Sequence, residues 1–100
     1  MARLTLTRAN ELLAEDEHDT SHTVCGRMVD NPAMRIISWH GRYVVAYWNY
    51  VHGKWCVTDT EGGYGTANDP EDAAAWCTRP ESFATLREAF DNAMMCRTDD

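Results

Sequence analysis

β-branched and aromatic residues are concentrated between residues 34 and 59, where glycines interrupt the apolar runs. This pattern predicts an antiparallel meander of three strands. The predicted strands are about Met34–Trp39, Arg42–Tyr50 and Lys54–Asp59. Two His-Gly pairs, at 40–41 and 52–53, fall where tight turns are needed, because glycine adopts positive φ without steric cost.

Period-two alternation divides this predicted sheet into two faces. Pairing Trp39 with Arg42, and Val51 with Lys54, sets the register that assigns residues to each face. One face, here called the tryptophan face, is expected to carry Ile37, Trp39, Val44, Ala46, Trp48, Tyr50, Trp55 and Val57. The other, the tyrosine face, is expected to carry Met34, Ile36, Ser38, Tyr43, Val45, Tyr47, Asn49, Cys56 and Thr58. The tryptophan face is the better candidate for the core, whereas the tyrosine face mixes apolar side chains with hydroxyls.

Helical spacing predicts a helix near each end of the chain. The N-terminal helix, at about 8–18, is capped by Thr5 or Thr7 and anchored by two leucines. The C-terminal helix, at about 86–96, begins at the capping-box sequence Thr85-Leu86-Arg87-Glu88. Its apolar residues recur at helical intervals, so this stripe is expected to lie across the tryptophan face.

The segment between the predicted sheet and the C-terminal helix begins with residues 59–69, which are rich in glycine and polar residues and are interpreted as a loop. Asp69 then caps a short helix whose first residue is Pro70. A chain of 100 residues suffices for one modest core. The sequence therefore predicts a single α+β domain, residues 1–100, with two layers.

The charge of the chain is strongly negative, because nine Lys and Arg face sixteen Asp and Glu, for a net charge of −7. Neutralising phosphates requires basic side chains, so direct binding to nucleic acid is not expected. An acidic surface favours a basic protein or a nucleoprotein complex as partner. One acidic cluster is Glu11, Glu15, Asp16, Glu17 and Asp19; the other is Asp59, Glu61, Asp69, Glu71 and Asp72.

Candidate chemistry is sparse. The four cysteines include no Cys-x-x-Cys pair and are expected to be free thiols, most of them in the core. His40 and His52 would lie at opposite ends of the central strand, about 30 Å apart, and cannot share a metal ion. We expect neither an enzyme nor a cofactor or metal site. The alternative from a different class is a small enzyme that uses a Cys–His pair or a metal. The residues at helical metal-ligand spacing are Glu11, Glu15, His18 and His22.

The location of the protein is inferred from what the sequence lacks. No apolar run approaches the ~18 residues that cross a bilayer. The N-terminal segment turns polar too early for a secretory signal peptide. We therefore expect no membrane contact and a location in the cytoplasm of the host bacterial cell.

In size, charge and layout the chain resembles the small inhibitors carried by phages and mobile elements, the anti-CRISPR proteins in particular. The resemblance extends over the whole chain and involves no residue motif, so it assigns no functional residue. It implies stoichiometric blocking of a bacterial defence complex, often by covering a basic nucleic-acid groove with acidic side chains. The expected function is therefore a small acidic inhibitor that binds a basic, nucleic-acid-handling complex. An immunity protein or antitoxin that neutralises a nuclease toxin would need the same surface.

The residues expected to bind the partner come from the N-terminal acidic cluster and from the tyrosine face. They are Glu11, Glu15, Asp16, Glu17, Asp19, Tyr43 and Tyr47. The acids would steer the encounter and the two tyrosines would hold the complex. Two alternatives stay open for the tyrosine face: the N-terminal helix covers it, or it pairs with a second copy of the chain.

Overall fold

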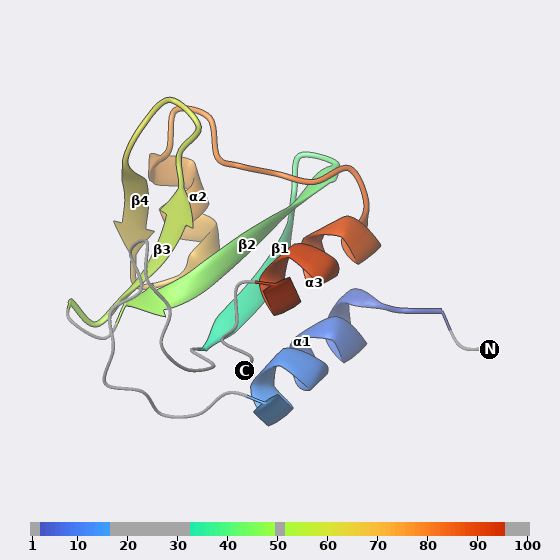
Figure 1. Ribbon diagram of the computed structural model, residues 1–100. Coiled ribbons are helices and arrows are strands. Elements are labelled where there is room, and N and C mark those ends of the chain that lie inside the picture. The colour runs from blue at the N-terminus through green and yellow to red at the C-terminus, as the bar shows by residue number, and fades with distance from the viewer. Residues whose placement is uncertain (1–2, 17–32, 50–51, 96–100) are drawn as a thin grey trace.

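The computed structural model describes residues 3–16, 33–49 and 52–95. Within these residues, four strands form one antiparallel sheet in the order β1-β2-β3-β4 (Figure 1). The strands are β1 Met34–Trp39, β2 Arg42–Asn49, β3 Lys54–Thr58 and β4 Tyr64–Ala67. The helices are α1 Leu6–Asp16, α2 Pro70–Trp76 and α3 Leu86–Met95. The α+β class and the meander of β1 to β3 are confirmed, and β4 extends the sheet.

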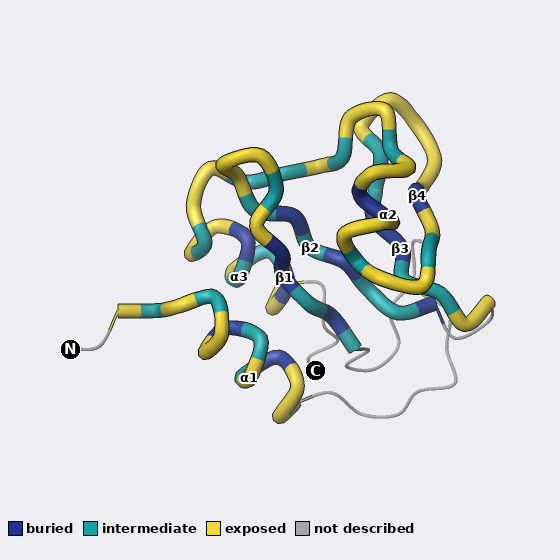
Figure 2. Tube along the Cα trace, turned by 180° about the vertical axis from the view of Figure 1, so that it is seen from behind, coloured by how far each residue is buried: buried dark blue, intermediate teal, exposed yellow. Residues whose placement is uncertain are grey.

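Helices cover both faces of the sheet, so the molecule has three layers and the predicted two-layer arrangement is wrong (Figure 1). α1 and α3 lie on the tyrosine face, and the buried residues of that layer are Ala9, Leu13, Met34, Ile36, Ala89 and Ala93. α2 lies on the tryptophan face, and the buried residues of that layer are Ile37, Val44, Ala46, Val57, Ala73 and Ala74. Figure 2 shows buried residues along the strands and on parts of the helices, with exposed residues around them.

The register of the sheet keeps the predicted division into two faces. β1 pairs with β2 through Trp39 and Arg42, as predicted. β2 pairs with β3 through Asn49 and Lys54, not through Val51, and this shift of two residues leaves the described strand residues on their expected faces. In the first hairpin, His40 and Gly41 both have positive φ, 50° and 79°, which is the requirement of a type I′ turn.

The strand β4 lies where a loop was predicted, so that prediction is wrong. Gly62 and Gly63, with φ of 117° and 84°, form the turn that returns the chain along β3. Within β4, Gly65 is a weak strand former, but it lies against α2, where an added Cβ would be 2.7 Å from Cys77 Sγ. The composition of β4 therefore reflects close helix packing and not local strand preference.

Residues 79–83, here called the wedge segment, lie between the far ends of β2 and β3. β2 and β3 pair with each other only near their shared turn. Farther along, Tyr43 and Phe83 exchange two backbone hydrogen bonds of 2.9 and 2.8 Å, and Glu81 N donates to Thr58 O at 2.9 Å. The wedge segment carries the chain across the sheet from α2 to α3 (Figure 1). This crossing explains why α3 covers the tyrosine face. The prediction that α3 would cover the tryptophan face is wrong.

The outer edge of β1 is closed by a side chain. Asn10 of α1 donates from Nδ2 to Ile36 O at 3.0 Å and accepts from Ile36 N at Oδ1, 2.7 Å. One amide side chain thus takes the place of a neighbouring strand at this point of the edge.

In the described residues, the helices are too short or too polar to cross a membrane.

Candidate functional site

The acidic residues predicted to steer a partner lie partly on the outer side of α1. Glu11 and Glu15 are exposed, and the Arg8 guanidinium lies 3.2 Å and 3.6 Å from their carboxylates. Asp16 is the last residue of α1, and Glu17 and Asp19 fall outside the described residues. Because Arg8 offsets part of the charge, α1 presents a weaker acidic surface than the sequence implied.

The two predicted anchors, Tyr43 and Tyr47, do not form an open platform. Both are partly buried and pack against the core between the sheet and the helices α1 and α3. The predicted alternative in which the N-terminal helix covers the tyrosine face is therefore the arrangement found. This layer leaves the acids of α1 outside and the tyrosines inside, so the two parts of the predicted site do not come together.

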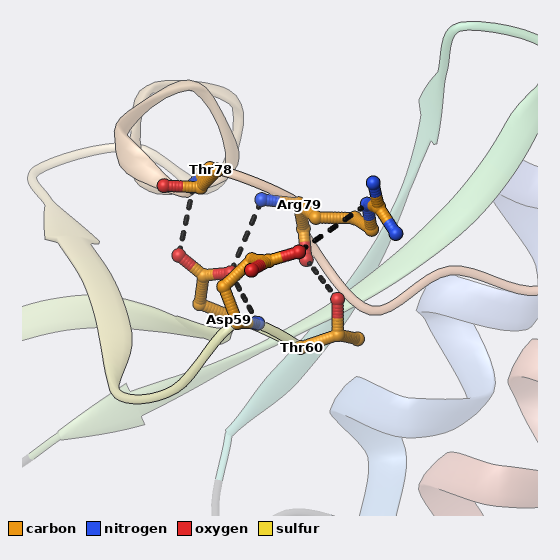
Figure 3. Close-up of polar contacts among 5 residues, drawn as sticks. Asp59, Thr60, Thr78 and Arg79 are labelled. Atoms are coloured by element: carbon orange, nitrogen blue, oxygen red, sulfur yellow. Dashed lines mark hydrogen bonds and ion pairs between the residues drawn. The ribbon is translucent and has the colours of Figure 1, made fainter.

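The second acidic cluster separates into structural and exposed members. The Asp59 carboxylate accepts backbone hydrogen bonds from Glu61 at 2.9 Å, Thr78 at 2.8 Å and Arg79 at 3.1 Å (Figure 3). These backbone hydrogen bonds, foremost the one from Glu61, hold the pKa of Asp59 below its usual value. Asp59 thus joins the β3–β4 turn to the chain that follows α2.

Three of the remaining four acids of this cluster gather at the beginning of α2, whereas Glu61 lies between β3 and β4. The fixed φ of Pro70 suits the first position of a helix, and Glu71 and Asp72 in the first turn favour the positive end of the helix dipole. Asp69 stands at the N-cap with extended backbone, although its side chain makes no cap hydrogen bond. All three carboxylates, of Asp69, Glu71 and Asp72, belong to exposed residues.

Trp76, the last residue of α2, is 75% exposed. Ala73 and Ala74 are the buried residues of α2 and bring it close to the sheet. Trp76 follows Asp72 by four residues, so both occupy one side of the helix. Beside them runs a groove of about 570 Å³, lined by Lys54, Thr66, Ala67, Asn68, Asp72, Ala75 and Trp76.

The sequence contained a signal for the exposure of Trp76 that the prediction missed. Acidic residues at 71 and 72 must face solvent, and positions four residues later share their sides of a helix. The side chains of Ala75 and Trp76 are therefore expected to face solvent, on the same sides of the helix as the two acids. A large aromatic side chain placed by this phase beside carboxylates is typical of a binding surface.

Of the two described thiols, one is buried and the other is partly buried. Cys56 is buried, and the Cys77 thiol lies 3.6 Å from both Val57 O and Ala73 O. Burial raises the pKa of Cys77, which keeps the thiol protonated and weakly nucleophilic at neutral pH. Within residues 3–16, 33–49 and 52–95, no three His, Cys, Asp or Glu side chains gather as metal ligands. His18 and His22 lie outside these ranges.

The chain was compared with family models, with curated proteins and with solved structures, and no match was found in any of the three. Any functional assignment therefore rests on the residues and surfaces of this chain. The exposed tryptophan, the neighbouring acids and the groove beside them make up the candidate site, here called the Trp76 site.

Proposed function

We propose that this protein is a small acidic inhibitor that binds a basic, nucleic-acid-handling bacterial complex in a stoichiometric manner. The observation that supports this proposal is the 75% exposure of Trp76 beside the acids of α2. A tryptophan is the residue type most enriched among those that dominate binding energy at protein interfaces. Carboxylates around it favour a partner segment that contains arginine or lysine.

The Trp76 site offers such a segment two kinds of contact. The indole ring can receive the face of a guanidinium or an ammonium group, an interaction of about 0.5–2 kcal/mol that grows as the cation loses water. Asp72 lies on the same side of α2 and can pair with that cation. Lys54, which also lines the groove, is held by Asn68 Oδ1 at 3.1 Å, on the sheet side of the site.

The net charge of −7 acts at longer range than these contacts. A surface that grips nucleic acid is basic, because it must neutralise phosphates. An acidic chain is attracted to that surface and competes with nucleic acid for it. Glu11 and Glu15 lie on α1, across the sheet from α2, so they add to this field without touching the partner segment.

The test is capture of partners from a bacterial lysate with three forms of the protein: wild type, Trp76→Ala and Met95→Ala. Met95 is 80% exposed on α3 and serves as the matched control for removing an exposed apolar side chain. We expect a basic nucleic-acid-binding protein to be retained by the wild type and by Met95→Ala. Retention should be lost with Trp76→Ala and at high salt.

The captured protein is then purified and titrated with the inhibitor while its nucleic-acid binding is measured. The proposal requires loss of nucleic-acid binding at a one-to-one ratio. Equal capture by wild type and Trp76→Ala would contradict the role of the Trp76 site. A captured partner that still binds nucleic acid when saturated with this protein would contradict the inhibitory function.

The acids of α2 can be tested separately through the rate of association. Replacing Asp69, Glu71 and Asp72 by their amides should slow association with the partner and flatten its dependence on salt, because steering comes from charge. The same change at Glu11 and Glu15 should have a smaller effect, since Arg8 already pairs with both. Stopped-flow or surface-binding kinetics at several salt concentrations would measure the association rate of each variant and its dependence on salt.

A further inference from the structure

A second groove, of about 510 Å³, lies on the other side of α2 from the Trp76 site, and Ala75 lines both. Its walls come from the first hairpin and from the chain that follows α2. The lining residues are Trp39, His40, Arg42, Ala75, Cys77, Thr78, Arg79, Pro80 and Ser82. This volume is within the ~300–1,000 Å³ range of small-molecule sites.

The charge of this groove is opposite to that of the chain as a whole. Its lining residues, all within the described part of the chain, include two arginines and a histidine but no Asp or Glu. Thr78 and Ser82 add hydroxyl groups. In a chain of net charge −7, a concave surface lined with cationic side chains and hydroxyls selects for an anionic ligand.

Arg42 is held in place at the rim of the groove. Its Nε donates to Ser82 Oγ at 2.7 Å and its Nη2 lies 3.4 Å from Ser82 O. Both partners are neutral oxygens, so the positive charge of this guanidinium is not cancelled by them. Fixing the side chain in advance lowers the entropy that a ligand must overcome to engage it.

Arg79 has a carboxylate partner, but a weak one. Its Nε lies 3.7 Å from Glu61, and the two side chains are 75% and 49% exposed. Exposed pairs of this kind contribute little, so a multiply charged anion can compete for Arg79. The other nearby acid, Asp59, has its carboxylate engaged by the backbone N–H groups of Glu61, Thr78 and Arg79.

The ring of His40 lies flat against that of Trp39, with centroids 4.4 Å apart and planes 9° from parallel. This pair provides an aromatic wall next to the arginines. From the two arginines, the hydroxyls and this wall, we propose that the groove binds a small molecule that carries a phosphate group. Arginine suits phosphate because its planar fork can donate two parallel hydrogen bonds to the oxygens. This inference does not rest on the Trp76 site.

Isothermal titration of the full chain with AMP, adenosine, inorganic phosphate and acetate tests the proposal. AMP and inorganic phosphate should bind in the millimolar range or tighter, whereas adenosine and acetate should not. The Arg42→Gln and Arg79→Gln variants should each weaken AMP binding by about tenfold, a typical cost of losing one charge-assisted contact. Arg87→Gln is the matched control, because Arg87 is an exposed arginine of α3 that faces Asp91 at 3.6 Å.

Several results would overturn the proposal. Adenosine binding as well as AMP would show that the ring and not the phosphate is recognised, and acetate binding as well as phosphate would show a general anion surface. Absence of binding by both phosphate-bearing probes would also contradict it. Arg42 contacts the wedge segment, so altered folding is a second explanation for weaker AMP binding by the Arg42→Gln variant. Arg79→Gln, whose backbone bonds are kept, separates the two: unchanged AMP binding in this variant overturns the proposal.

Discussion

The two faces of the sheet are covered to different extents. The tyrosine face lies under two helices, α1 and α3, of 11 and 10 residues. The tryptophan face lies under α2 alone, which has seven residues. Because this single helix is short, a groove remains on each side of α2.

We infer from this difference that the tyrosine face contributes mainly to stability and the tryptophan face mainly to binding. On the tyrosine face, buried alanines let two helices approach the strands closely, and partly buried aromatic side chains pack against that core. On the tryptophan face, the same use of alanine at 73 and 74 holds a helix too short to fill the layer. Both candidate binding surfaces of the molecule therefore lie beside α2, on the thinner side.

The largest expected effect is on the thicker side, from Leu13→Ala. Leu13 is fully buried between α1 and the sheet, so truncation removes apolar contacts and leaves a cavity. We expect the free energy of unfolding to fall by ~2–5 kcal/mol. Urea denaturation measures this loss, and partner binding by the folded fraction should be unchanged. A drop in partner affinity would show that the two faces are not independent.

Gly65→Ala tests the thinner side. The added Cβ would collide with the backbone of Ala73 and with Cys77 Sγ, so α2 must move away from β4. We expect the free energy of unfolding to fall by ~1–3 kcal/mol or more. Partner binding should also weaken, because Trp76 moves with α2. Met95→Ala, at an exposed position of α3 away from this site, is the control and should change neither quantity by a comparable amount. Wild-type stability in Gly65→Ala would refute the close packing of α2.

Asn10→Ala tests the closed edge of the thicker side. It removes the partner of both Ile36 N and Ile36 O, and unsatisfied groups of this kind cost about 1–3 kcal/mol. We expect the lower part of that range, because these bonds are only partly buried. Hydrogen exchange should also show faster exchange of the Ile36 amide. An unchanged exchange rate would indicate that the side chain does not protect this edge.

The smallest expected effect concerns Asp59 and pH. Its pKa is lowered in the folded state, so its ionised form stabilises the fold above the unfolded pKa of about 3.9. That contribution is lost as the pH falls from this value through the folded pKa. Asp59→Asn should therefore be less stable than wild type at neutral pH, and the two should converge in acid. A difference in melting temperature that persists at about pH 2 would assign the effect to something other than the carboxylate.

The parts of the fold that could be predicted are those set by local sequence. The turn at His40-Gly41, the strands on either side of it and the capping box of α3 each depend on a few neighbouring residues. In that capping box, Glu88 N donates to Thr85 Oγ1 at 3.1 Å and Thr85 N donates to Glu88 Oε1 at 3.3 Å. Side-chain alternation also placed residues on the correct faces, because a register shift of two preserves the alternation.

The parts that could not be predicted depend on distant contacts. β4 has a glycine because a helix lies against it, and α3 changes face because the wedge segment crosses the sheet. The acids and the tyrosines of the predicted binding site are separated for the same reason. Tyr43 and Tyr47 were expected to hold the partner or to lie under the N-terminal helix, and only the positions of α1 and α3 decide between the two. The exposure of Trp76 was within reach, since the acids before it set the helical phase.

The wedge segment also determines when the fold can be completed during synthesis. Arg42 and Ser82 are 40 residues apart in the chain, yet they meet where this segment enters the sheet. A ribosome releases β2 and β3 well before residues 79–83, so the nascent sheet is open at that point and the N–H and C=O of Tyr43 lack their final partner. Such a long-range contact slows folding, because the entropy of closing the loop is lost before the contact stabilises the chain. The sheet therefore reaches its native form only after residues 79–83 have been translated.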